Sequence, residues 1–126
     1  MGQSWLAVGL GGALGSLARH GVNVWVTRRM GQSGPYATLV VNIVGCGVIG
    51  LLAGLLASER LVMTPTVRVF VFVGILGGFT TFSSFGLDTF TLAREGRHAA
   101  ALLNAVGQVV IGLAALAAGY FAALKT

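Results

Sequence analysis

The sequence predicts an all-α membrane protein, because it carries too few charges to dissolve and its apolar runs are long. Of its 126 residues, 56% are hydrophobic and 9% are charged, whereas a soluble domain has about 25% charged residues. The apolar runs approach the roughly 20 residues that a spanning helix needs, and they lack the alternation typical of a barrel strand. We therefore expect one transmembrane domain over residues 1–126.

Four spans are expected, at about residues 4–27, 36–57, 67–93 and 99–124. Only short segments separate them, so consecutive helices should be antiparallel neighbours. The first run has no basic segment before it, which favours a retained helix over a cleaved signal peptide. The chain has no nucleophile–base pair, metal-ligand spacing or phosphate loop, so an enzyme is not indicated.

The basic residues outside the spans give almost no preference for one orientation. They are too scattered for a nucleic-acid surface and are expected to meet lipid headgroups. One side of the membrane would hold Arg60, Arg68 and Lys125, and the other Arg28, Arg29, Arg94 and Arg97. This balance permits insertion in both directions and an antiparallel dimer. The alternative is a single orientation fixed by other features.

Small residues recur at intervals of four within the spans. Gly11 and Gly15 form one such pair, and Cys46, Gly50 and Gly54 continue the pattern in the second span. This spacing allows helix backbones to approach closely in lipid. We expect some of these faces at a contact between subunits, with packing inside one chain as the alternative. Cys46, the only cysteine, is interpreted as a packing residue.

The third span contains the most informative stretch, residues 77–86, with the sequence GGFTTFSSFG. Two adjacent glycines cost a helix about 2 kcal/mol relative to alanine, and the hydroxyl residues compete for backbone hydrogen bonds. The stretch predicts a helix break at mid-membrane, which is tolerated only inside protein or beside a polar cavity. The alternative is an intact helix with a glycine-rich packing face.

Several side chains near this stretch could contact an anion. Phe82 and Phe85 are three residues apart and share a helix face, and the edges of aromatic rings are electropositive. Ser83 and Ser84 carry hydroxyl donors, and Asn42 adds an amide donor from the second span. The alternatives are ordinary aromatic packing and, for Asn42, an interhelical hydrogen bond.

Charged side chains in the spans also favour an anion. Arg19 lies in the first span, where it either attracts an anion to a vestibule or extends to the headgroups. Asp88 is the only acidic residue in a predicted span, so the carboxylates expected in a cation-coupled transporter are scarce. The sequence does not assign Asp88 a role.

Taken together, these residues resemble the Fluc (CrcB) family of fluoride channels. The resemblance covers the whole chain and is most specific in the third span. It rests on the motif at residues 77–85 followed by an acidic residue, on Asn42 before Gly45, on Arg19 after a glycine-rich run, and on Asn104 with Gly107.

The resemblance implies a passive, fluoride-selective channel in the bacterial inner membrane that exports cytoplasmic fluoride and lowers its toxicity. Such channels are antiparallel, dual-topology homodimers with two pores. A structural sodium ion lies on the dimer axis, held by backbone carbonyls that correspond to Gly77 and Thr80. Phe82 and Phe85 would form aromatic boxes, and the remaining pore residues would be Asn42, Ser83 and Ser84, with Arg19 in the vestibule.

One position departs from the family pattern. Many relatives carry a small hydroxyl residue where this chain has Gln108, whose longer amide would either donate to fluoride or narrow the pore. Two alternative functions stay open. A small multidrug-type transporter would match in size but depends on a first-span carboxylate, which is absent. A non-conducting scaffold would explain the glycines but not the cluster of aromatic and hydroxyl residues.

Overall fold

The computed structural model describes residues 1–126 and contains helices only, as predicted. The order is α1 (Gly2–Met30), α2 (Gly34–Ala57), α3 (Pro65–Arg68), the π-helix η1 (Val69–Leu76), α4 (Gly77–Phe79), α5 (Phe82–Arg94) and α6 (His98–Lys125). The elements α3, η1, α4 and α5 together form the predicted third span. Its first half is mostly π-helical, which the sequence analysis did not predict.

Three helical segments are long and apolar enough to cross a membrane: Gly34–Ala57, Pro65–Arg94 and His98–Lys125. Only 18 of 126 residues are buried, and large apolar side chains are exposed along every long helix. The protein is therefore a multi-pass membrane protein. The helix α1 is long enough, at 29 residues, but is not among the three, because glycines and Arg19 lower its hydropathy.

Local signals explain where the helices begin and end. Gly31 follows α1 in the left-handed conformation (φ 76°), and its N–H donates to the Thr27 carbonyl at 2.8 Å, a helix end that glycine favours. Pro35 lies in the first turn of α2, where a missing N–H costs nothing. The Thr64 hydroxyl accepts from the Val67 N–H and so caps α3.

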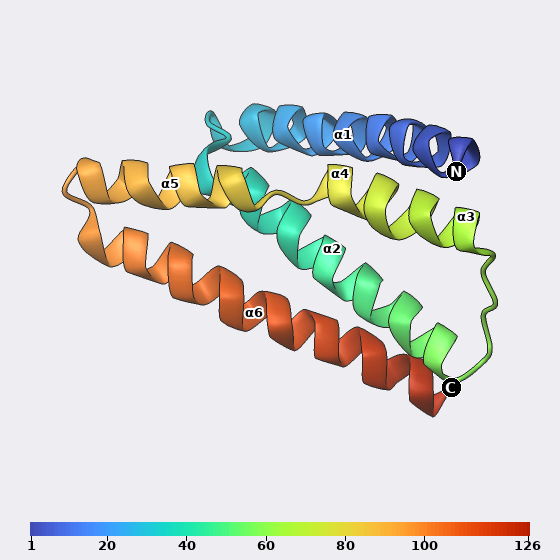
Figure 1. Cartoon of the computed structure of the whole chain (residues 1–126). Helices are drawn as coiled ribbons and strands as arrows, with labels where there is room; N and C mark the ends of the chain where they lie inside the picture. Colours follow the sequence, from blue (N-terminus) through green and yellow to red (C-terminus); the bar gives the residue numbers. More distant parts are fainter.

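The main helix contacts join alternate segments of the chain rather than consecutive ones. The helix α2 packs along α6, and α1 packs along η1 and α4; Figure 1 shows that the members of each pair run in the same direction. Consecutive spans are antiparallel, as expected, but α1 and α2 touch only slightly. The prediction that consecutive helices are antiparallel neighbours is confirmed, since α5 and α6 are also in contact, but the most extensive contacts join alternate segments.

Glycines explain this arrangement. A Cβ atom on Gly11 or Gly15 would overlap the backbone carbonyls of η1, and one on Gly50 would overlap the Leu116 carbonyl of α6. Gly54 likewise lies against Tyr120. The glycine faces that we expected partly at a subunit contact are therefore used inside the chain. Since each face permits close backbone approach, the chain is built as two tightly packed parallel pairs.

Candidate ion pathway

The third span is broken at Thr80 and Thr81, both of which are extended (φ −87°, ψ 162° and φ −154°, ψ 119°). Figure 1 shows the resulting gap between α4 and α5. The predicted break within residues 77–86 is confirmed, and it lies just after the glycine pair. Gly77 keeps helical angles (φ −62°, ψ −36°), so the chain leaves the helix only at Thr80.

The Thr81 side chain starts the second half of the span. Its hydroxyl oxygen accepts from the Ser84 N–H at 3.1 Å and so caps α5. The same hydroxyl lies 3.1 Å from the Ser84 hydroxyl and 3.3 Å from the Ser83 hydroxyl. A threonine at this position satisfies a backbone amide that the break would otherwise leave without a partner.

Asn42 on α2 provides hydrogen-bond partners for the backbone groups at the break. Its Nδ2 donates to the Thr81 carbonyl at 3.0 Å, and its Oδ1 accepts from the Thr81 N–H at 2.9 Å. One side-chain amide thus replaces both hydrogen bonds that the Thr81 peptide groups would make in a helix. The interhelical hydrogen bond considered for Asn42 is present, and its partner is the break itself.

Because Asn42 and the Thr81 hydroxyl accept from two backbone N–H groups, two backbone carbonyls lose their helical partners. In a continuous α-helix the Gly77 carbonyl would accept from the Thr81 N–H, and the Thr80 carbonyl from the Ser84 N–H. The Thr81 N–H instead donates to Asn42, and the Ser84 N–H to the Thr81 hydroxyl. Gly77 and Thr80 both line a cavity of about 410 Å³ that Asn42, Cys46 and Phe82 share.

Two carbonyl oxygens that lack their helical partners fit a hard cation. The chain has no group of three or more His, Cys, Asp or Glu side chains that could hold a metal. A cation bound at this position would therefore rest on backbone oxygens. Gly45 contributes space for the turn, because a Cβ atom there would overlap the Thr80 methyl group.

The structure brings together four of the residues predicted to face an anion. Asn42, Phe82, Phe85 and Gln108, with Val109, line a cavity of about 110 Å³. The two rings lie 5.6 Å apart between centroids at an angle of 40°. Phe82 is 83% exposed, so most of its ring extends away from this chain, where a second subunit or lipid would meet it.

A row of polar side chains continues from this cavity along α6. Gln108 is 6% exposed; its Oε1 accepts from Asn42 at 2.8 Å, and its Nε2 donates to Asn104 at 3.1 Å. Asn104 Nδ2 in turn donates to the Thr89 hydroxyl at 2.9 Å. From the sequence, Asn104 was named only as part of a family motif, and Thr89 was not predicted to belong to the site. The spacing of four between Asn104 and Gln108 was the available signal.

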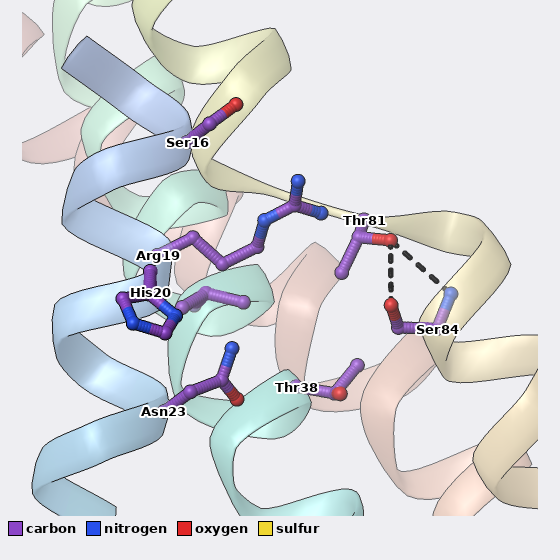
Figure 2. A pocket seen from close by; sticks show the side chains of 8 residues that line it. Ser16, Arg19, His20, Asn23, Thr38, Thr81 and Ser84 are labelled. Atoms are coloured by element: carbon purple, nitrogen blue, oxygen red, sulfur yellow. Dashed lines mark hydrogen bonds between the residues drawn. The ribbon is translucent and has the colours of Figure 1, made fainter. Parts of the chain in front are cut away.

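A separate polar cavity lies between α1, α2 and the start of α5. It has a volume of about 330 Å³ and is lined by Ser16, Arg19, His20, Asn23, Thr38, Val41, Thr81 and Ser84. Figure 2 shows the Arg19 guanidinium pointing across this cavity toward Thr81. No acidic residue lines it, so its electrostatic potential favours an anion. Arg19 thus lies in a polar cavity beside the break.

Ser83 and Asp88 line none of the three cavities described above, and Cys46 lines only the one beside Gly77 and Thr80. Ser83 is exposed and reaches only the Thr81 hydroxyl. Cys46 is near Gly112 and packs between α2 and α6, as interpreted. The Oδ2 atom of Asp88 is buried without a hydrogen-bond partner.

A family model and several known proteins match this chain over most of its length. A family described as CrcB-like protein, Camphor Resistance (CrcB), matches residues 6–120. A protein of Paracoccus denitrificans named fluoride-specific ion channel FluC is 50% identical over 119 residues, which cover 94% of this chain and 93% of the relative.

Proteins with the same name from Opitutus terrae and Chloroflexus aurantiacus are similar as well. The first is 46% identical over 95% of this chain and 92% of its own length. The second is 44% identical over 90% of each. The match extends over the glycine contacts, the break and the polar row of α6. The chain therefore belongs to the CrcB family.

Proposed function

We propose that the protein is a fluoride-selective, passive ion channel that exports cytoplasmic fluoride and lowers its toxicity, and that it is not an enzyme. The observation that carries this proposal is the small cavity shared by Asn42, Gln108 and the Phe82–Phe85 pair at a break in the third span. Close relatives over nearly the whole chain are named fluoride-specific ion channels. A bacterial inner membrane is the corresponding location.

The proposed conduction follows from the chemistry of the walls. Fluoride is small and strongly hydrated, so a pore must replace its water with donors while holding it weakly enough for release. Amide N–H groups, the hydroxyls of Ser83 and Ser84, and the edges of the Phe82 and Phe85 rings are such donors. Arg19 would raise the local concentration of anions at the vestibule.

The functional unit we propose is an antiparallel homodimer with two pores. Phe82 lines the small cavity of the proposed pathway, yet it is 83% exposed, so this chain alone leaves most of its side chain uncovered. The nearly balanced loop charges allow a second, inverted copy to insert. We also propose that α1 spans the membrane as the fourth crossing, since it lies along η1 and α4 over glycine contacts (Figure 1).

A structural sodium ion would bind at the break. The Gly77 and Thr80 carbonyls, which have lost their helical partners to Asn42 and Thr81, are the groups that would hold it. Its charge would offset the repulsion between anions. Replacing sodium by potassium should lower the melting temperature of the purified protein. Equal stability and equal fluoride flux in both salts would contradict this assignment.

The proposed function is tested by fluoride efflux from liposomes that contain the purified protein. A fluoride electrode should record rapid efflux, and a chloride electrode should record none above protein-free vesicles. Since passive flow needs no coupled ion, efflux should follow the fluoride gradient after a potassium ionophore removes the membrane potential. Absence of fluoride flux, or equal chloride flux, would overturn the proposal.

A further inference from the structure

The polar cavity beside the break has a second ionisable wall residue besides Arg19. Ser16, Arg19, His20 and Asn23 recur at the spacing that places side chains on one face of a helix. All four line this cavity of about 330 Å³, and Figure 2 shows the His20 ring on the same wall of α1, between Arg19 and Asn23. The proposed conduction uses Arg19 and leaves His20 without a role.

His20 lies far from both ends of its helix. Met30, the last residue of α1, is about 15 Å away along the helix axis at a rise of 1.5 Å per residue. In a spanning α1 this position falls inside the hydrocarbon region, which is about 30 Å thick. An ionisable side chain at that depth is costly in lipid and is expected to face a polar cavity. His20 meets this expectation, because the walls around it are polar.

The polar groups of Arg19 and His20 are available to an ion or to water. The hydrogen bonds among the residues of this cavity join only Thr81 and Ser84 (Figure 2). Arg19 carries a fixed positive charge, whereas histidine is the side chain whose charge ordinarily changes between about pH 5 and 8. Protonation of His20 therefore doubles the positive charge of the cavity walls, which no acidic wall residue offsets.

Other titratable groups surround the cavity without lining it. They are Arg28 and Arg29 on α1, Tyr36 and Cys46 on α2, and Asp88 and Arg94 on α5. The elements η1 and α4, which pack against α1, contain no titratable residue. Of these groups only Asp88 carries a carboxylate, so it is the alternative source of a charge that changes with pH.

We infer that His20 makes this cavity a pH-dependent anion site, and that protonation of its ring raises fluoride conduction in acidic conditions. The inference rests on the proposed fluoride channel and adds a residue to its vestibule. A second positive charge beside the path raises the local concentration of an anion and its rate of entry. Because a passive pore gains conductance in both directions, the reversal potential stays the same. Acidic media are also those in which more fluoride crosses lipid as neutral hydrogen fluoride.

The proton and the anion favour each other at such a site. A bound anion stabilises the protonated ring, and the protonated ring stabilises the anion by the same free energy. The pH at which the rise in conductance is half complete should therefore move upward as the fluoride concentration increases. A histidine with a purely structural role would show no such shift.

The test is the fluoride current of the purified protein in a planar bilayer of uncharged lipid, at about pH 8 and at about pH 5.5. Uncharged lipid prevents a contribution from titrating headgroups. In the wild type the acidic current should exceed the alkaline one about threefold, as expected for a unit charge several ångströms from the ion in a solvated cavity. The ratio should shrink in about 1 M of an impermeant salt, which screens the added charge.

Substitutions assign the response to one side chain. His20→Gln keeps a polar side chain without a titratable charge and should remove the pH response. His20→Lys is charged at both pH values; it should also lack the response but carry more current than His20→Gln. His98→Gln removes the other histidine, which lines none of the cavities described here, and should keep the wild-type ratio. Asp88→Asn should keep it too.

The outcomes separate this inference from the proposed function. A wild-type current that does not change with pH, or a pH response that persists in His20→Gln, would overturn the role of His20. A midpoint that does not move with fluoride concentration would overturn its coupling to the anion. If His20→Gln is not recovered folded, His20→Tyr replaces it and should likewise lack the response. A wild type without fluoride current at either pH would instead overturn the proposed function.

Discussion

The contact between α2 and α6 and the break in the third span meet the same requirement in opposite ways. In lipid, every backbone N–H and C=O group must find a partner within the protein. At Gly50 each helix satisfies its own backbone, and glycine only allows the two to touch. At the break the backbone cannot satisfy itself: Asn42 on α2 supplies both partners of the Thr81 peptide groups, and the Thr81 hydroxyl accepts from the Ser84 N–H.

This difference separates stability from conduction. Changes at the glycine contact should damage folding first, since they alter the distance between helices throughout the chain. Changes at the break should affect flux more than folding, because they alter the orientation of a few polar groups. Four predictions, in order of decreasing effect, test this separation.

The largest effect is expected for Gly50→Ala. A Cβ atom there would overlap the Leu116 backbone, which cannot move aside as a side chain could. Overpacking of this kind costs about 1–3 kcal/mol, and the expected result is loss of monodisperse protein on size exclusion. Gly47→Ala on the same helix, where a Cβ would meet nothing within 4 Å, is the control. Equal recovery of both variants would show that the close contact is dispensable.

Asn42→Leu should abolish most conduction. It removes the donor to Gln108 and the side-chain partners of the Thr81 N–H and carbonyl. Thr81 lines two cavities large enough for water, so water can replace these partners and the cost stays below the about 1–3 kcal/mol of a fully buried unsatisfied group. We expect fluoride efflux to fall about tenfold or more, with protein still recovered in folded form. Asn42→Asp keeps the acceptor for the Thr81 N–H, and its fluoride efflux should lie between those of the wild type and Asn42→Leu. Wild-type flux in Asn42→Leu would rule out control of the pathway by the break.

Phe82→Ile and Phe85→Ile should each reduce efflux several-fold while the dimer persists. Isoleucine keeps the apolar volume but has no electropositive ring edge, and aromatic interactions of this size are worth about 0.5–1.5 kcal/mol. Phe90→Ile changes an exposed ring on the same helix and serves as the control. Unchanged flux in both Phe82→Ile and Phe85→Ile would remove the aromatic pair from the mechanism.

The smallest effect is expected for Thr81→Val. It removes the hydroxyl cap of α5, which is typically worth about 1 kcal/mol. A thermal-shift measurement should show a drop of a few degrees, and Thr81→Ser, which keeps a capping hydroxyl, should restore most of it. If Ser and Val variants melted alike, the hydroxyl would not be the group that starts α5.

The sequence alone determined the class of the protein and the place of its break. Too few charges for water, long apolar runs and a hydroxyl-rich stretch after two glycines are local properties, and each has a direct physical consequence in lipid. The third-span motif also identified the family. Asn42, Phe82 and Phe85 followed from the local pattern of polar and aromatic residues in the spans, whereas Gln108 was implied only by the family resemblance.

Only the tertiary structure decided which elements meet and which donors are free. The small-residue spacing in α1 and α2 is equally compatible with contacts inside one chain or between two chains. The spacing shows which face of a helix allows close approach, but not which helix packs against that face. Likewise, the sequence shows that Asn42 is polar but not that the Thr81 backbone and Gln108 already use both its protons. Hydrogen-bond partners distant in the chain depend on how whole helices pack, which no local pattern specifies.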